Sequence, residues 1–163
     1  MEDISVVIDG YKFNFRVCAL IENNSRYLLE ESKVTDFLNL PGGRVHAGES
    51  TLSAIKRELK EELGLCDVNP RLIKVTEQFF KFADKKYHEL NFVYYINLSN
   101  EHELCQKNHF ANLDNQDETM VWVNIKDLHN YKILPEFIYT IKDDKKITQL
   151  IYDKINNQEP IGI

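Results

Sequence analysis

The chain has 163 residues, of which 43% are hydrophobic and 28% are charged, and its formal net charge is −6 at pH 7. This length fits a single domain over residues 1–163, and the apolar content excludes a chain that is disordered by composition. The acidic balance disfavours general nucleic-acid binding, which needs a basic surface to meet phosphates.

The start of the chain and the cysteines indicate a compartment. The first residues, MEDISVVIDG, are acidic and mixed, unlike the basic lead and apolar run of a signal peptide. The longest apolar runs, such as 92–96, are too short to span a bilayer. Cys18, Cys66 and Cys105 are scattered and fit free thiols rather than disulfides or a zinc site. We expect a cytoplasmic protein with no membrane partner.

The N-terminal residues 4–30 read as strands joined by tight turns. Asp9-Gly10 lies between β-type residues, which is a strong hairpin signal. A second turn is expected at Asn23-Asn24.

The clearest predicted helix covers residues 50–63. Ser50 or Thr51 can cap its start, and Gly64 stands where a left-handed terminating residue belongs. Apolar residues spaced three or four apart form one stripe along it. At about 100° per residue, three carboxylates fall together beside this stripe. They are Glu58, Glu61 and Glu62.

The later elements follow from composition and patterning. We expect strands over 71–82, 87–98 and 120–125, a hairpin turn over 83–86, a loop over most of 99–118, a short helix over 134–142, and a strand or a helix over 147–152.

The three clustered carboxylates need an explanation, because like charges at this spacing cost about 0.2–0.5 kcal/mol per pair. Arg57 stands four residues before Glu61 and can pair with it, whereas Glu58 and Glu62 lack an equivalent basic partner within their own helix. One interpretation is a solvated charged face, the usual meaning of such a string taken alone. The other is a set of oxygen ligands for a hard divalent cation that substrate phosphates complete.

A glycine-rich loop before the helix favours the second interpretation. The turn LPGG at 40–43 feeds this loop, and Gly48 precedes the helix. Such a loop brings backbone N–H groups to a phosphate. The spacing from Gly43 to Gly48 is that of an ATP-binding P-loop, but Glu49 stands where that motif needs lysine. The reversed charge excludes the P-loop.

The same region carries a family resemblance. Gly43, five residues, Glu49, seven residues and then RELxEExGL over 57–65 match the signature of the Nudix (MutT-like) hydrolases at every defined position. The resemblance implies an α/β/α sandwich with a mixed β-sheet, the signature helix on one face and a C-terminal helix on the other. It also implies a Mg²⁺-dependent (or Mn²⁺-dependent) hydrolase. Such enzymes cleave a diphosphate bond in a nucleoside diphosphate linked to another group, by attack of water on phosphorus.

The resemblance further implies roles for individual residues. The metal ligands would be Gly42, through its carbonyl, and Glu58, Glu61 and Glu62. Arg57 would orient a glutamate, with Glu61 or Glu49 as its partner. Glu49 would brace the loop against the helix, and Gly43 and Gly64 would be conformational.

The general base differs among family members, and the resemblance leaves it open between a glutamate of the signature, Glu58 or Glu61, and an acid outside it. The acids that precede Trp122 are Asp114, Asp117 and Glu118. We favour Glu118, although each of the three also fits an ordinary loop acid.

Arg44 and His46 in the glycine-rich loop are the predicted substrate contacts. His46 stands where many relatives carry glutamate, and it fits either a phosphate contact or an exposed side chain. Leu38 stands where many relatives carry tryptophan, which removes a stacking surface.

The expected partner is a small nucleoside diphosphate derivative, and pocket loops outside the signature decide which one. A non-catalytic Nudix module that senses a nucleotide or a partner is the alternative, although such modules usually carry a broken signature and this one is intact. An enzyme acting on the 5′ end of RNA fits the acidic balance less well. Strand edges and aromatic residues permit a homodimer.

Overall fold

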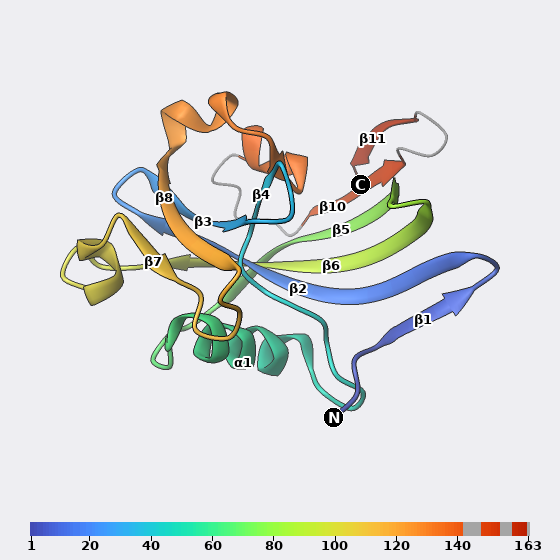
Figure 1. Ribbon diagram of the computed structural model, residues 1–163, viewed down its shortest axis with the longest axis horizontal. Helices are drawn as coiled ribbons and strands as arrows, with labels where there is room; N and C mark the ends of the chain where they lie inside the picture. The colour runs from blue at the N-terminus through green and yellow to red at the C-terminus, as the bar shows by residue number, and fades with distance from the viewer. Residues whose placement is uncertain (142–147, 154–157, 163) are drawn as a thin grey trace.

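The computed structural model describes residues 1–141, 148–153 and 158–162. A mixed β-sheet forms its centre, and helix α1 (Thr51–Leu63) lies against one face (Figure 1). The strands are β1 (Ser5–Ile8), β2 (Tyr11–Asn23), β3 (Arg26–Ser32), β4 (Leu38–Asn39), β5 (Arg71–Phe82), β6 (Lys85–Asn97), β7 (His109–Ala111), β8 (Glu118–Asn124), β9 (Ile133–Leu134), β10 (Thr148–Asp153) and β11 (Gln158–Gly162). Three 3₁₀ helices, η1 (Glu103–Gln106), η2 (Ile125–Asn130) and η3 (Glu136–Tyr139), complete the described elements.

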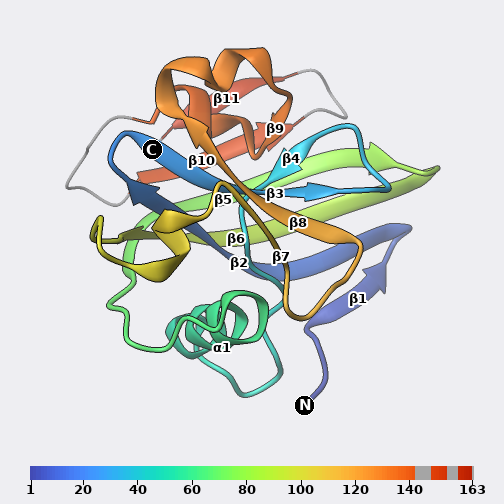
Figure 2. The same ribbon diagram turned by 60° about the vertical axis from the view of Figure 1, so that its left-hand side comes forward.

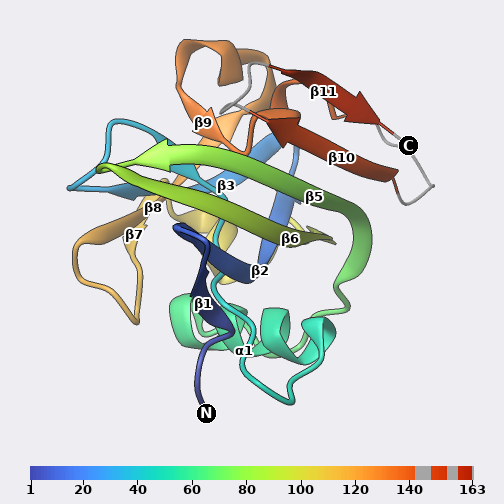
Figure 3. The ribbon, with the colours of Figure 1, turned by 90° about the vertical axis from the view of Figure 1, so that its right-hand side faces the viewer.

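The sheet combines parallel and antiparallel pairs. Its strand order is β11-β10-β5-β6-β2-β3-β4-β9, and β1 is added to β2, β8 to β3 and β7 to β8. The pairs β2/β6, β4/β9 and β5/β10 are parallel, and the other pairs are antiparallel. The long β5–β6 hairpin curves beside β2 (Figure 3). The predicted α/β fold with a mixed sheet is therefore confirmed.

The hairpins turn through two residues with positive φ, the geometry that matches strand twist. The turn pairs are Asp9-Gly10, Asn24-Ser25 and Ala83-Asp84. The first is as predicted. The second lies one residue later than predicted, because the side chain of Asn23 donates to the carbonyl of Leu98 at 3.0 Å and β2 extends to include it. The third is shorter than the predicted 83–86, since β6 already begins at Lys85.

Two apolar layers lie on opposite faces of the sheet, because strand side chains alternate. Val17, Ala19 and Ile21 of β2 pack on the α1 side, whereas Cys18 and Leu20 face the layer of η2 and η3. Figure 2 shows α1 below the sheet and these short helices above it. The first face therefore positions α1, and α1 carries the glutamates.

The predicted C-terminal helix over 134–142 is wrong over the described part, which ends at residue 141. Leu134 closes β9, and a cis peptide bond joins it to Pro135 before the short η3. Phe137 and Ile138 of η3 are both 1% exposed and belong to the apolar layer on this face. The fold thus keeps a second layer on this face, but builds it from 3₁₀ turns.

Two other segments take a definite form. The segment predicted as strand or helix over 147–152 is strand β10, with residue 147 outside the described part. The predicted loop 99–118 contains η1 and β7. Among the described helices, none has the length and apolar character needed to cross a bilayer.

Candidate active site

Both ends of α1 are capped as the sequence predicts. The Oγ of Ser50 accepts from the amide of Ser53 at 3.1 Å. Gly64 has φ 67° and donates its N–H to Lys60 at 3.0 Å, in the left-handed conformation that glycine adopts without strain. These caps fix where the helix begins and ends, and so fix the direction in which each glutamate points.

The glycine-rich turn lies tightly between β2 and α1. The amide of Val17 donates to the carbonyl of Gly43 at 2.9 Å. A Cβ on Gly42, whose φ is 140°, would come within 2.7 Å of Cys18 Cα. A Cβ on Gly43 would come within 2.6 Å of Oε2 of Glu58. The backbone therefore requires glycine at position 42, whereas a side chain at position 43 would displace the carboxylate of Glu58.

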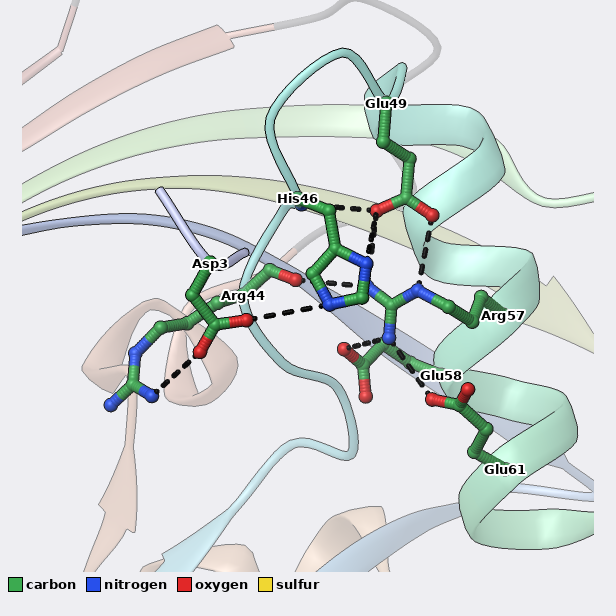
Figure 4. Close-up of polar contacts among 7 residues, drawn as sticks. All are labelled: Asp3, Arg44, His46, Glu49, Arg57, Glu58 and Glu61. Atoms are coloured by element: carbon green, nitrogen blue, oxygen red, sulfur yellow. Dashed lines mark hydrogen bonds and ion pairs between the residues drawn. The ribbon is translucent and has the colours of Figure 1, made fainter. Parts of the chain in front are cut away.

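Arg57 binds three carboxylates at once (Figure 4). Its Nε donates to Glu49 at 3.0 Å, and its Nη1 donates to Glu58 at 2.7 Å and to Glu61 at 3.0 Å. Its Nη2 also donates to the carbonyl of Arg44 at 2.9 Å. Both expected partners, Glu61 and Glu49, are thus bound. The expectation that Glu58 lacks a basic partner in its own helix is wrong, because Arg57 next to it reaches its carboxylate.

Glu49 joins the loop to the helix through this arginine. Its second oxygen accepts the amide of His46 at 3.1 Å and Nη2 of Arg57 at 3.1 Å. The hydrogen bonds from Arg57 hold the pKa of Glu49 below its usual value. Through these contacts, Glu49 connects the loop at His46 to the helix at Arg57.

Arg44 and His46 point toward the N-terminal residues (Figure 4). Arg44 donates to Asp3 at 3.1 Å, and Nε2 of His46 lies 3.4 Å from the other oxygen of Asp3. In this structure, the polar partners of the two side chains come from Asp3 and Glu49 rather than from the glutamates that end α1.

Glu62 lies in different surroundings, although it sits on the same helix. Its side chain is 7% exposed, and its Oε2 has no hydrogen-bond partner within the described structure. Burial, and then the negative charges of Glu30 and Glu58, raises the pKa of Glu62 to about 9. The N–H of Gly42 favours the ionised form only in part. Glu62 is therefore a buried acid whose carboxylate the described residues satisfy only in part.

Glu30 of β3 and Glu118 of β8 approach Glu62 from the sheet. Burial, and then the charge of Glu118, raises the pKa of Glu30 to about 7. Burial also raises the pKa of Glu118. The side-chain amide of Asn112 donates to Glu118 at 3.2 Å and to Glu30 at 3.4 Å. We call buried Glu30 and Glu62, together with half-buried Glu118, the buried carboxylate cluster.

The structure separates the three acids that precede Trp122. Glu118 joins the buried carboxylate cluster. Asp117 forms an exposed ion pair with Lys33 at 3.1 Å. The backbone of Asp114 donates to Asn112 at 2.8 Å, so Asp114 belongs to the turn that leads to Glu118.

Sequence reasoning missed Glu30, Asn112 and Arg16. Glu30 lies two residues after the buried Leu28, so an acid at an inward strand position was the available signal. Arg16 of β2 lies close enough to lower the pKa of Glu30, Glu58 and Glu118. Asn112 had no local signal in its polar segment.

The residues fit a divalent cation by their chemistry. Among the described residues, no three Asp, Glu, His or Cys side chains already stand in the arrangement of a formed metal site. However, the unpartnered oxygen of Glu62 lies near the charges of buried Glu30 and half-buried Glu118, and hard divalent cations prefer carboxylate oxygens. The described hydrogen bonds also leave the carbonyl of Gly42 unused.

A mixed sheet, a glycine turn and an acidic helix together define a class that is known from solved structures. The MutT protein of Bacillus halodurans matches with a TM-score of 0.62 at 18% identity, over 91% of this chain and 97% of that chain. A MutT NUDIX hydrolase from Burkholderia pseudomallei matches with a TM-score of 0.56 at 25% identity, over 71% and 86%. The fold is therefore that of the MutT-type hydrolases.

The family follows from the sequence as a whole. The NUDIX domain model matches residues 12–144, and the chain belongs to the Nudix family. Nucleoside triphosphatase NudI of Escherichia coli O139:H28 is 28% identical over 128 residues, which cover 72% of this chain and 86% of that protein. The resemblance drawn from the signature is confirmed, and the protein is an enzyme of the pyrophosphohydrolase kind.

Proposed function

We propose that the protein is a Mg²⁺-dependent (or Mn²⁺-dependent) hydrolase of a nucleoside diphosphate linked to another group, which cleaves the diphosphate bond by attack of water on phosphorus. One observation carries the proposal: the unpartnered oxygen of Glu62, buried beside Glu30 and Glu118. Buried like charges are costly unless a cation neutralises them.

The proposed metal ligands are Glu58, Glu61, Glu62 and the carbonyl of Gly42. Arg57 holds Glu58 and Glu61 on one side of the helix, while the N–H of Gly42 bonds to Glu62. When bound, the cation would offset the charge of the phosphate oxygens and lower the pKa of the attacking water. This explains how a chain of net charge −6 binds a polyanion.

For the general base we propose Glu118, with Glu58 and Glu61 as the alternatives. Burial raises the pKa of Glu118, and a carboxylate whose pKa lies nearer neutrality removes a proton more effectively. The hydrogen bond from Asn112 fixes one of its oxygens. Glu61 is bound to Arg57 and is 46% exposed, so its surroundings favour the base role less.

For the substrate we propose a nucleoside triphosphate as the first class to test, because the relative NudI is named a nucleoside triphosphatase. Arg16 would bind phosphate oxygens beside the carboxylates whose pKa it lowers. Arg44 and His46 remain proposed substrate contacts, and a bound phosphate would compete with Asp3 for them.

A substrate screen with Mg²⁺ tests the proposal. It would cover nucleoside triphosphates, nucleotide sugars, dinucleoside polyphosphates and ADP-ribose, and would measure released phosphate and pyrophosphate. We expect turnover of at least one class, which chelation abolishes and Mg²⁺ restores. Binding of a nucleotide in calorimetry, without release of phosphate or pyrophosphate from any class, would contradict the proposal and favour a sensing module.

Three broader proposals accompany this function. We propose one domain over residues 1–163, and a cytoplasmic location that suits the free Cys18, Cys66 and Cys105. We also propose a homodimer, for which the exposed apolar side chains of β1 offer surface. Sedimentation at several protein concentrations tests the dimer.

A further inference from the structure

Glu30 occupies a position where a charge has no structural use. It lies in β3 opposite Met120 of β8, and its side chain is 8% exposed. The next residue, Glu31, points the other way along the strand and is exposed. The two glutamates therefore have the same chemistry, but only Glu30 is buried.

The contacts of Glu30 do not account for its charge. Its described hydrogen bond comes from the amide of Asn112 at 3.4 Å, and a neutral glutamine oxygen would accept that bond equally well. Glu62, Glu118 and Glu58 add negative charge around it, and Arg16 offsets only part of this field. The described residues therefore compensate the charge of ionised Glu30 only in part.

Asn112 ties Glu30 to the rest of the site. One amide nitrogen serves both Glu30 and Glu118, while the Oδ1 of Asn112 accepts the amides of Asp114 and Asn115 at 2.8 and 3.1 Å. The amide of Leu113 then donates to the carbonyl of Glu62 at 2.9 Å. This turn therefore links the carboxylates of Glu30 and Glu118 to the end of α1 that carries Glu62.

We propose that Glu30 is a further carboxylate ligand of the divalent cation, reaching it from β3 while Glu62 reaches it from α1. The inference rests on the proposed function, because it assigns Glu30 to the same cation. Besides the partly compensated charge of Glu30, the buried oxygen of Glu62 that has no hydrogen-bond partner within the described structure also points to a ligand between the two acids. Glu30 lies outside the signature, so the family resemblance does not imply this role for it.

Binding of Mn²⁺ to the full chain without nucleotide tests the inference. Free Mn²⁺ is measured by electron paramagnetic resonance for the wild type, Glu30→Gln and the matched control Glu31→Gln. We expect Glu30→Gln to weaken Mn²⁺ binding by at least the tenfold to hundredfold that supporting residues of metal sites typically contribute. Glu31→Gln should bind Mn²⁺ as the wild type does. Without metal, Glu30→Gln should melt at or above the wild-type temperature, because a buried charge is removed.

A second pair of variants separates charge from shape. Glu30→Asp and Glu30→Asn have nearly the same shape and differ in charge, so Glu30→Asp should bind Mn²⁺ more tightly. Equal Mn²⁺ affinity within this pair, or wild-type affinity in Glu30→Gln, overturns the inference.

The variant Glu62→Gln distinguishes the inference from the proposed function. If Glu62→Gln loses Mn²⁺ while Glu30→Gln keeps it, only the role of Glu30 is wrong. If the wild type itself binds no Mn²⁺, the proposed function fails together with the inference.

Discussion

Two groups of carboxylates, each with members on helix α1, have opposite surroundings. On one flank, Glu49, Glu58 and Glu61 share the guanidinium of Arg57, and every one of them has a cationic partner. On the other, Glu62 faces Glu30 and has an unpartnered oxygen. The first group is compensated by Arg57 even without metal, whereas the second needs a cation to offset its charge. Charge compensation, rather than residue type, therefore separates the two groups.

Burial explains why the difference matters. Glu61 is 46% exposed, and solvent screens its charge, whereas Glu62 is 7% exposed. The interaction of like charges is several times stronger near the interior than in water. A cation at Glu62 would therefore relieve far more free energy than a cation at Glu61.

Breaking the uncompensated group should have the largest effect. Glu62→Gln keeps the shape of the side chain but removes the proposed metal ligand, so we expect turnover to fall by about a hundredfold or more, beyond the range of merely supporting residues. The metal-free protein should be as stable as the wild type or more so, because glutamine is neutral without having to hold a proton in this buried site. Steady-state kinetics and urea unfolding measure the two effects. The matched control is Lys60→Gln on the exposed side of the helix, and turnover of Glu62→Gln equal to that of this control would contradict the prediction.

Breaking the compensated group should lower stability as well as turnover. Arg57→Ala leaves Glu49 and Glu58 without their cation, and loss of one partner of a buried pair typically costs about 3–5 kcal/mol. Because Glu61 is half exposed, we expect about 3 kcal/mol in the free energy of unfolding. Urea titration measures it. Arg57→Lys should recover only part of the loss, since lysine lacks the planar fork; full recovery would show that charge alone matters.

Two neighbouring glycines sharpen the contrast between backbone and site. Gly42→Ala would strain a backbone with φ 140° against Cys18, and we expect about 1–3 kcal/mol of destabilisation. Gly43→Ala meets only the movable carboxylate of Glu58, so it should cost less stability and instead lower turnover. Thermal melting and kinetics on both variants test this. Similar melting temperatures for the two would be the contrary result.

The pH dependence of stability should also separate the two groups. The pKa of Glu62 is about 9 in the folded protein against an ordinary 4.5, so the native state retains a proton that the unfolded state releases. The free energy of unfolding of the metal-free protein should therefore fall as pH rises from about 5 to 9, by at most about 1.4 kcal/mol per pH unit for one proton. Glu30 adds to this fall up to about pH 7.

The compensated group acts in another pH range. Hydrogen bonds from Arg57 lower the pKa of Glu49. Its contribution to the free energy of unfolding is therefore complete at pH values above the ordinary pKa of glutamate, and is lost only as the pH falls below that pKa. Urea unfolding from pH 5 to 9 should show a flatter profile for Glu62→Gln and for the wild type with Mg²⁺. A wild-type profile that is already flat without metal would contradict the pKa shift of Glu62.

The predictions from sequence succeeded where local signals suffice. The caps of α1 at Ser50 and Gly64, and the turn at Asp9-Gly10, depend on neighbours in the chain and were found. Glu30 and Asn112 are 82 residues apart, and only the sheet brings them together. The segment after Leu134 has a composition typical of a helix, so the sequence predicted one. The structure instead pairs β9 with β4, a contact between distant parts of the chain, and only the short η3 follows Pro135.

The release of protons on metal binding tests the central claim most directly. If a divalent cation takes the place of the proton on buried Glu62, calorimetry of Mn²⁺ binding near pH 7 in buffers of different ionisation enthalpy should show release of about one proton. Glu62→Gln should bind weakly and release none. Tight binding with no proton release, identical in the wild type and in Glu62→Gln, would show that the cation binds elsewhere and would contradict the account.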